Sequence, residues 1–147
     1  MAVNPLIAQG TLNRIRASVM VANYPALNVT SGYLGKAGIS LALQGDATAV
    51  YDTMTGIVNS PEPYRRVEIT LHLLKTQALS GAWVAQEQAT SLLGTVNIYP
   101  DSSVFPTYNI LNASIGTVRE LSYAGDDPVY AVTLFGIWII NNNLFNI

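Results

Sequence analysis

The clearest pattern along the chain is a strict alternation of apolar and polar side chains over residues 67–73. The apolar positions are Val67, Ile69, Leu71 and Leu73, and the polar positions between them are Glu68, Thr70 and His72. Neighbouring side chains of a β-strand point to opposite faces, so a period of two is typical of a strand with one buried face. This segment therefore predicts a half-buried strand with a polar outer face.

Further strands are predicted by similar alternation or by β-branched and aromatic content, over residues 14–22, 39–43, 96–99, 108–121 and 129–140. The segment 129–140 is apolar on both faces, so we expect it to be covered on both sides. Pro100 and Asp101 favour a turn. The run from Gly125 to Pro128 predicts a hairpin between the last two long strands. The chain is therefore predicted to be mainly β.

One helix is predicted between Ser80, which can cap its N-terminus, and Gly94, which can end it. The apolar residues within it fall near helical spacing: Val84, Ala85, Ala89, Leu92 and Leu93. We expect this helix to flank the sheet and to cover an open face or edge.

Residues 44–64 are weakly patterned and are predicted to form a long loop. Tyr51, Met54, Ile57 and Val58 stand there among Asp, Thr and Gly residues. Loops of this length in compact domains are usually functional or disordered, and the apolar content argues against disorder. With no repeat or low-complexity tract, residues 1–147 are interpreted as a single domain.

Charge is scarce for a protein that lacks a membrane-helix pattern. Charged residues make up 11% of the chain, with a net charge of −2, and the mean hydropathy is +0.30. A typical soluble domain has roughly a quarter charged residues, and a monomer of this size would expose roughly 450 Å² of surface per charge. Such a surface favours association. We therefore interpret the chain as a subunit whose neighbours cover much of its surface.

Other features limit where the protein acts. The longest apolar run, residues 129–140, is about half of the ~20 residues that a spanning helix needs. The first ten residues do not resemble a secretory signal. The chain has no cysteine, which excludes disulfides and thiolate metal sites and fits a reducing cytoplasm.

The residues that could support catalysis are few. His72 is the only histidine, and no serine lies in a Gly-x-Ser-x-Gly motif. Residues 32–36 lack the spacing of a phosphate-binding loop. Asp126 and Asp127 fit a hairpin tip better than a metal pair. We therefore expect no enzyme activity, no catalytic residues, no cofactor and no metal site.

Two groups at the surface suggest contacts with neighbours. The basic pairs Arg14 with Arg16 and Arg65 with Arg66 are expected to be solvated or to form ion pairs, since the net charge is acidic. The C-terminal segment carries Leu144, Phe145 and Ile147 beyond the last predicted strand. These three either fold back onto the core or dock on a neighbouring subunit.

The order of these features resembles a tail tube protein of contractile-tailed bacteriophages, a family related to the tube proteins of contractile injection systems. The resemblance lies in the opening residues 4–7, the first strand, the long loop before residues 67–74, the helix after it and the apolar last strand. It implies a β-sandwich or small barrel whose sheets join between subunits into six-fold rings. Stacked rings would form the inner tail tube, through which DNA passes into the host.

The resemblance also implies partners and a location. The partners are further copies of the chain, a sheath protein, the baseplate and the tail terminator, with transient, non-specific passage of DNA. The particle is a virion tail or a bacteriocin-like particle, assembled in the host cytoplasm. The family has no active site, so the resemblance implies no catalytic residues in this chain.

Candidate contact residues follow from this assembly. The channel-facing candidates are Glu68, Thr70 and His72, with Arg16 pairing across strands with Glu68. The candidates for contacts between subunits or rings are Tyr51, Met54, Ile57, Val58, Leu144, Phe145 and Ile147.

Two other functions remain open at this stage. One is a tail terminator or head-tail connector, which would form a single ring rather than a tube. The other is a monomeric β-sandwich that binds carbohydrate or peptide, with Trp83, Trp138 and the eight tyrosines available to line its site. Trp138 lies in the most apolar segment, where core packing is the better interpretation.

Overall fold

The structure is a computed structural model that describes residues 15–122 and 124–143. The strands in this part of the chain are β1 (Ala17–Val21), β2 (Leu34–Gln44), β3 (Thr48–Asp52), β4 (Ile57–Pro61), β5 (Tyr64–Leu74), β6 (Leu92–Pro100), β7 (Tyr108–Arg119) and β8 (Val129–Ile139). The helices are α1 (Ala78–Ala89) and the short 3-10 helices η1 (Pro25–Leu27) and η2 (Ser31–Tyr33). The predicted mainly-β class with one flanking α-helix is confirmed.

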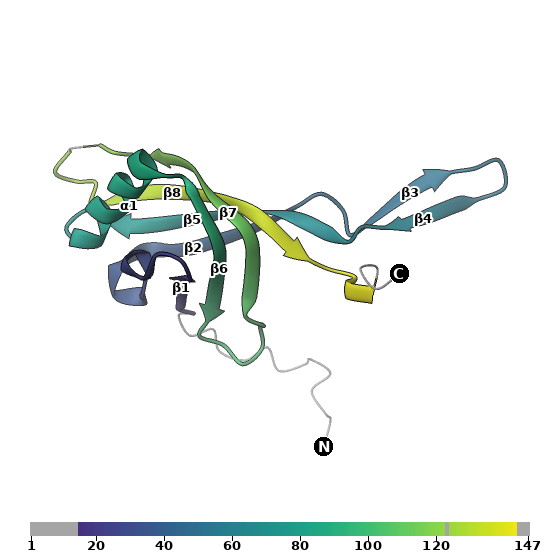
Figure 1. The fold of residues 1–147 in the computed structure, drawn as a ribbon, viewed down its shortest axis with the longest axis horizontal. Coiled ribbons are helices and arrows are strands. Elements are labelled where there is room, and N and C mark those ends of the chain that lie inside the picture. Colours follow the sequence, from purple (N-terminus) through teal and green to yellow (C-terminus); the bar gives the residue numbers. More distant parts are fainter. Residues whose placement is uncertain (1–14, 123, 144–147) are drawn as a thin grey trace, which may run out of the picture.

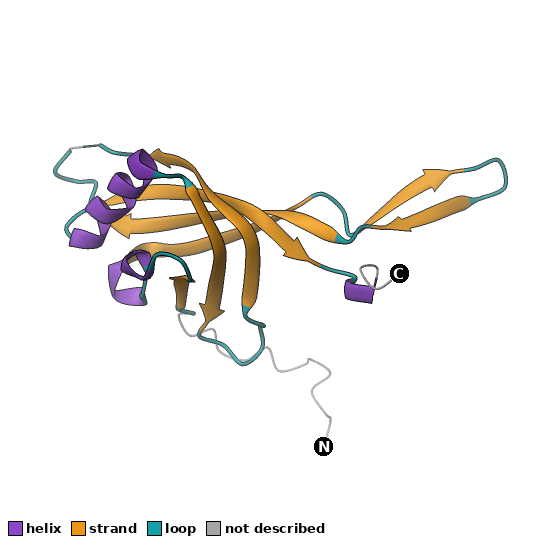
Figure 2. Cartoon of the chain, viewed as in Figure 1, coloured by secondary structure: helices purple, strands orange, loops and turns teal. Residues whose placement is uncertain are grey.

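Six of the strands form one antiparallel sheet with the order β1-β6-β7-β8-β5-β2. The sheet curls into half of a barrel, and α1 lies across one end of it (Figures 1 and 2). Strands β5 and β8 pair without interruption from Tyr64 opposite Ile139 to Leu74 opposite Val129. Strands β7 and β8 are antiparallel neighbours, so the predicted final hairpin is confirmed.

The hydrophobic core lies on one face of this sheet. The alternating apolar residues of β5 are 0–1% exposed, as the period of two predicts: Val67, Ile69, Leu71 and Leu73. Trp83 of α1 and Leu27 of η1 are buried in the same cluster. These two elements therefore close the core from the side that the curled sheet leaves open.

The predicted boundaries of the helix are wrong at both ends. The helix begins at Ala78, and Ser80 lies inside it, where its hydroxyl donates a hydrogen bond to the carbonyl of Leu74. The helix ends at Ala89, and Gly94 belongs to β6 with a φ of +81°. That left-handed conformation accommodates a bulge in the pairing of β6 with β7. Gly94 is thus required by a strand rather than by a helix end.

Residues 44–64 do not form the predicted irregular loop. Strands β3 and β4 pair from Thr48 opposite Pro61 to Asp52 opposite Ile57, as a separate two-stranded sheet. We call residues 48–61 the arm. It projects from the body of the molecule, which is formed by the six-stranded sheet and the helices (Figure 1). The prediction of an irregular loop was therefore wrong. That the segment has a function stays a prediction.

No helix in the described residues is long and apolar enough to cross a membrane.

Candidate assembly surface

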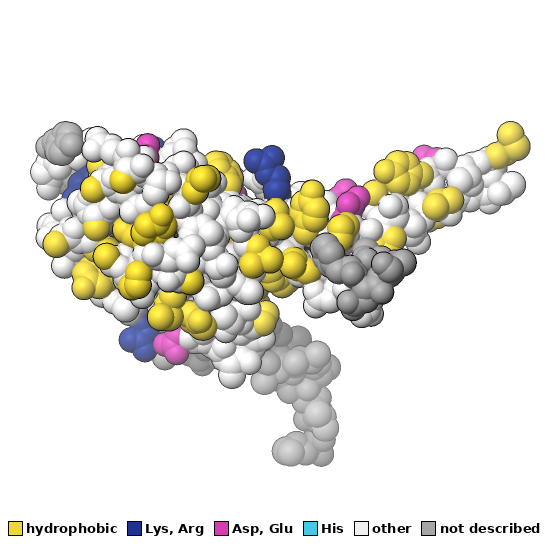
Figure 3. Space-filling view, in the orientation of Figure 1, with side chains coloured by type: hydrophobic (Ala, Val, Ile, Leu, Met, Phe, Trp, Pro, Cys, Tyr) yellow, Lys and Arg dark blue, Asp and Glu magenta, His cyan; other side chains and the backbone are white. Residues whose placement is uncertain are grey.

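The arm exposes large apolar side chains on both of its faces. Five of them are 53–102% exposed: Val50, Tyr51, Met54, Ile57 and Val58. Figure 3 shows hydrophobic side chains along the arm up to its tip. A two-stranded hairpin is at best marginally stable in water without a sheet or helix to pack against. Exposed apolar side chains on such an element mark an interaction surface.

Hydrogen bonds hold the root of the arm against the body. One Arg65 guanidinium nitrogen, Nη2, donates to the carbonyls of Leu43 at 3.0 Å and Gly45 at 2.8 Å. The backbone N–H of Glu62 donates to the carbonyl of Ala47 at 2.9 Å. Asn141 adds a side-chain bond from Nδ2 to the carbonyl of Glu62 at 2.8 Å. These bonds hold the two sides of the root together and tie it to the segment that follows β8.

A backbone hydrogen bond closes the turn at the tip of the arm, and none of the described residues covers Met54 there. The backbone N–H of Thr53 donates to the carbonyl of Gly56 at 2.8 Å. Each strand has five residues and therefore spans about 17 Å. An arm of this length can reach well into a neighbouring subunit.

Charge on this segment has a single sign. Asp46, Asp52 and Glu62 are its ionisable acids, and residues 44–64 contain no Lys, Arg or His. Asp52 lies at the distal end of β3, whereas Asp46 and Glu62 lie at the root. A surface that fits the arm therefore combines apolar and basic side chains.

The three predicted channel residues share one face of β5. Glu68, Thr70 and His72 alternate with the buried core residues and are half-buried on the opposite face of the sheet. Gln44 on β2 donates from Nε2 to the Glu68 carboxylate at 2.9 Å. Their common face is as predicted, and their position facing a channel stays a prediction.

The predicted pair of Arg16 and Glu68 is wrong. Arg16 instead donates from Nε at 3.2 Å and Nη2 at 3.1 Å to the carboxylate of Asp101. Strands β6, β7 and β8 separate β1 from β5 in the sheet, which keeps Arg16 and Glu68 apart. Both partners of the observed pair are more than 60% exposed, so the pair contributes little to stability. Arg14 lies outside the described residues.

The remaining predicted residues divide into two groups. Leu144, Phe145 and Ile147 lie outside the described residues. Trp83 is fully buried, whereas Trp138 packs edge-on against Tyr108 with ring centroids 5.3 Å apart and is partly buried against the core. The two tryptophans therefore do not line a common exposed site, which weakens the sequence argument for a carbohydrate-binding surface.

The acidic side chains and His72 do not form a metal cluster within residues 15–122 and 124–143. No group of three or more His, Asp or Glu side chains there has the arrangement of a metal site. Asp127 lies 3.7 Å from the amino group of Lys75 and forms an ion pair. This pair anchors the β7–β8 connection to the end of β5.

Sequence reasoning missed two exposed features. Val104 is 80% exposed and Phe105 is 52% exposed, in the loop between β6 and β7. The adjacent apolar pair between Pro100 and Pro106 was the available signal. The second feature is a groove between β1 and β2, the two edge strands. It had no signal in the sequence, since its walls come together only when the sheet curls.

Comparison with known proteins identifies the fold. No family model matches the sequence, and a search of curated proteins found no significant match. Among solved structures, the chain resembles the sheath/tube terminator of an extracellular contractile injection system, PVC, in its extended state. The TM-score is 0.53 and the identity 19%, and the match covers 92% of this chain and 95% of that chain.

A second solved structure matches with a lower score. It is the tube terminating cap of the anti-feeding prophage, with a TM-score of 0.49 and 14% identity, covering 95% of this chain and 100% of that chain. Only the first of the two scores supports a shared fold. That fold extends over nearly the whole of both chains.

Proposed function

We propose that the protein is a structural subunit of a contractile tail or injection particle, and that its copies form the ring that terminates the tube. The observation that supports this proposal is the shared fold with a sheath/tube terminator over 92% of this chain. The low charge content and the exposed apolar arm support a subunit that is covered by its neighbours.

The sequence pointed to two related functions, a tube subunit and a tube terminator. The resemblance implied a tube subunit and left a terminator as an alternative. The structural match is to a terminator, so it favours that alternative over the tube. The two functions also differ physically, because a tube subunit must bind copies of itself on both axial faces. A terminator binds the tube on one face and ends the assembly there.

Several finer features belong to the same proposal. The partners are further copies of the chain, the last ring of a tube and a sheath protein, with six copies in a ring. The ring leaves a channel for DNA, and the protein acts in the tail particle as a structural component rather than as an enzyme. It needs no cofactor for this role.

Electron microscopy of the purified protein tests the proposal directly. Discrete rings of uniform diameter are the expected result, since a terminator does not stack on itself. Long tubes would instead support the tube subunit. Only monomers at micromolar concentration, with no recruitment to added tail tubes, would contradict both functions.

Recruitment to tubes provides a second measurement. Rings mixed with purified tail tubes should be found at one end of each tube. Binding to the portal end of a capsid instead would favour a head-tail connector.

A further inference from the structure

A groove of about 540 Å³ separates the two edge strands of the curled sheet. Its apolar lining comes from both edges and from the strands beneath them: Ile15, Leu34, Ile39, Leu41, Ile98 and Tyr108. Strands β1 and β2 are the outermost strands of the six-stranded sheet. The groove is thus the open seam of the half-barrel, and we call it the seam groove.

The charge of the seam groove is opposite to that of the arm. Its only charged lining residues in the described chain are Arg16 and Lys36. Arg16 is already paired with Asp101, whereas Lys36 has no acidic partner among the described residues. Lys36 is also exposed on the outer edge of β2. One unpaired cation therefore stands at the lip of an apolar groove.

The outer edge of β2 along this lip has no strand paired with it among the described residues. The register of β2 against β5 shifts between Leu34 and Ile39, so residues 35–38 have no opposite partner. Gly38 has a φ of +65° within this bulge. Among the described strands, β2 pairs with β5 alone. An open edge next to an apolar groove is the type of surface that accepts an added strand or hairpin.

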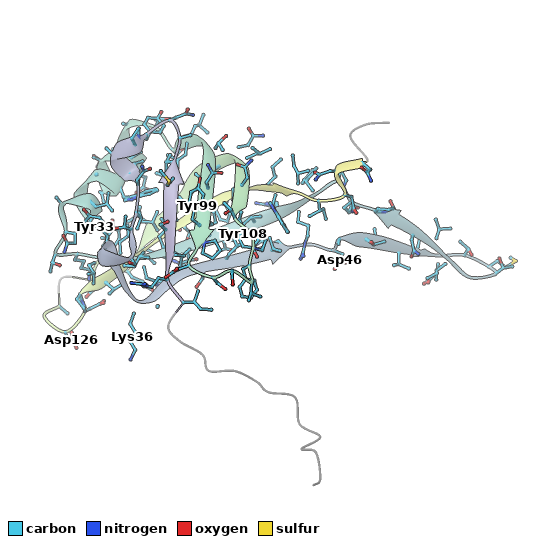
Figure 4. All side chains as sticks on the ribbon, turned by 90° about the horizontal axis from the view of Figure 1, so that it is seen from below. Tyr33, Lys36, Asp46, Tyr99, Tyr108 and Asp126 are labelled. Carbon is cyan, nitrogen blue, oxygen red and sulfur yellow. The ribbon has the colours of Figure 1, made fainter. Side chains whose placement is uncertain are left out.

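The arm of the same chain does not reach this groove. The groove lies along residues 34–41 of β2, and the arm begins at Thr48, beyond the end of that strand at Gln44. A fully extended strand from Lys36 to Gln44 would cover about 26 Å, which the bulge at residues 35–38 shortens, and the arm continues away from the body (Figure 1). Figure 4 shows Asp46 where the arm begins and Lys36 toward the other end of the body. A matching arm must therefore come from another copy.

We propose that the arm of one copy inserts into the seam groove of the next copy, with Asp52 of the arm placed near Lys36 of the receiving copy. This inference rests on the proposed function and names the surface that receives the arm. Exposed apolar side chains on the arm would cover the apolar lining of the groove. The opposite charges would set the register of the contact.

The contact joins two different surfaces, so it is heterologous. Repeated from copy to copy, such a contact closes into a ring when the rotation allows it. Each copy then has one occupied groove and one inserted arm. The seam of each half-barrel is covered by its neighbour, which removes an exposed sheet edge.

Cysteine cross-linking tests the contact, because the chain has no cysteine of its own. Met54→Cys is introduced in one preparation and Ala37→Cys in another, and the two are mixed and oxidised. A cross-linked dimer should form in the mixture and in neither preparation alone. Gln88→Cys on the exposed side of α1 replaces Ala37→Cys as the matched control and should give no such dimer.

Four results of the cross-linking experiment would contradict the inference. Rings without the cross-link between positions 54 and 37 overturn the inference and leave the proposed function intact. Cross-linking of Met54→Cys with itself means that arms meet each other, which also overturns the inference. A thiol at position 37 that is unreactive in the monomer means that the chain covers its own groove, which overturns the inference as well. Absence of any ring contradicts the proposed function as well.

Charge exchange gives an independent test. Lys36→Glu and Asp52→Lys should each weaken association about two- to five-fold per contact, the range of an exposed ion pair. The double variant should recover much of this loss, because every contact again joins opposite charges. Arg119→Glu, which changes an exposed cation on β7, is the control for net charge. Additive losses in the double variant would contradict a contact between these two side chains.

Discussion

The body and the arm contain similar apolar residues in very different surroundings. In β5 the apolar side chains are 0–1% exposed because they alternate with polar ones and face a core. In the arm, Ile57 and Val58 are adjacent, so they point to opposite faces, and they are 61% and 53% exposed. The apolar residues of β5 therefore stabilise the fold, whereas those of the arm are not covered by any of the described residues. We therefore expect the arm to serve association rather than folding.

Removal of the arm should have the largest effect, because it should abolish assembly and leave the fold of the body intact. A deletion of residues 49–58 is expected to leave a folded body, because the arm forms its own sheet. The same deletion should abolish ring formation, since it removes all five exposed apolar side chains of the arm. Sedimentation velocity would measure the assembly, and circular dichroism would check the fold. Normal rings from the deletion variant would show that the arm has another role.

A matched pair of substitutions sharpens the contrast in stability. Ile69→Ala should lower the free energy of unfolding by about 2–5 kcal/mol, because Ile69 is fully buried. Ile57→Ala should change it by less than about 0.5 kcal/mol, because Ile57 is 61% exposed. Urea unfolding of the unassembled protein measures both values. Similar losses for the two variants would mean that the arm packs on the body.

Tyr130 should give a smaller, pH-dependent effect within the body. Its hydroxyl is buried and donates to the carbonyl of Ser80 at 2.9 Å, and burial raises its pKa above the ordinary value of 10.0. The neutral form is thus favoured in the folded state. Its contribution to stability is complete below about pH 10 and is lost as the pH rises toward the folded pKa.

Tyr130→Phe tests this contribution. The variant should lose about 1 kcal/mol near neutral pH, because the Ser80 carbonyl loses its donor. Its stability should then fall less steeply than that of the wild type above pH 10. Thermal unfolding between pH 8 and 11 provides the comparison, and parallel curves would contradict the assignment.

The smallest effect on assembly is expected from Glu68→Lys. Glu68 lies on the β5 face opposite the core and accepts a hydrogen bond from Gln44, so neither the core nor the arm should change. If this face lines the channel, repeated lysines would bind phosphate and slow the passage of DNA. Particle assembly and DNA ejection measured side by side test this. Normal ejection would show that Glu68 does not face the channel.

The sequence alone determined the elements that have two unlike faces. Residues 67–73 were predicted as a strand with the correct buried face, because one side meets the core and the other does not. The mainly-β class and the hairpin of β7 and β8 followed from similar local signals. The helix was predicted with wrong ends, since Ser80 and Gly94 have the residue types of caps but serve the interior of α1 and a bulge in β6.

Only the tertiary structure decided which elements meet. The sheet order places β1 and β5 at a distance, so Arg16 pairs with Asp101 rather than with Glu68. The arm escaped prediction because both of its faces are exposed, and a strand without a buried face has no period of two. The seam groove joins residues 15–17 to residues 31–41 and to β6 and β7. Such a surface exists only after distant strands curl together, because no local pattern encodes which edges will face each other.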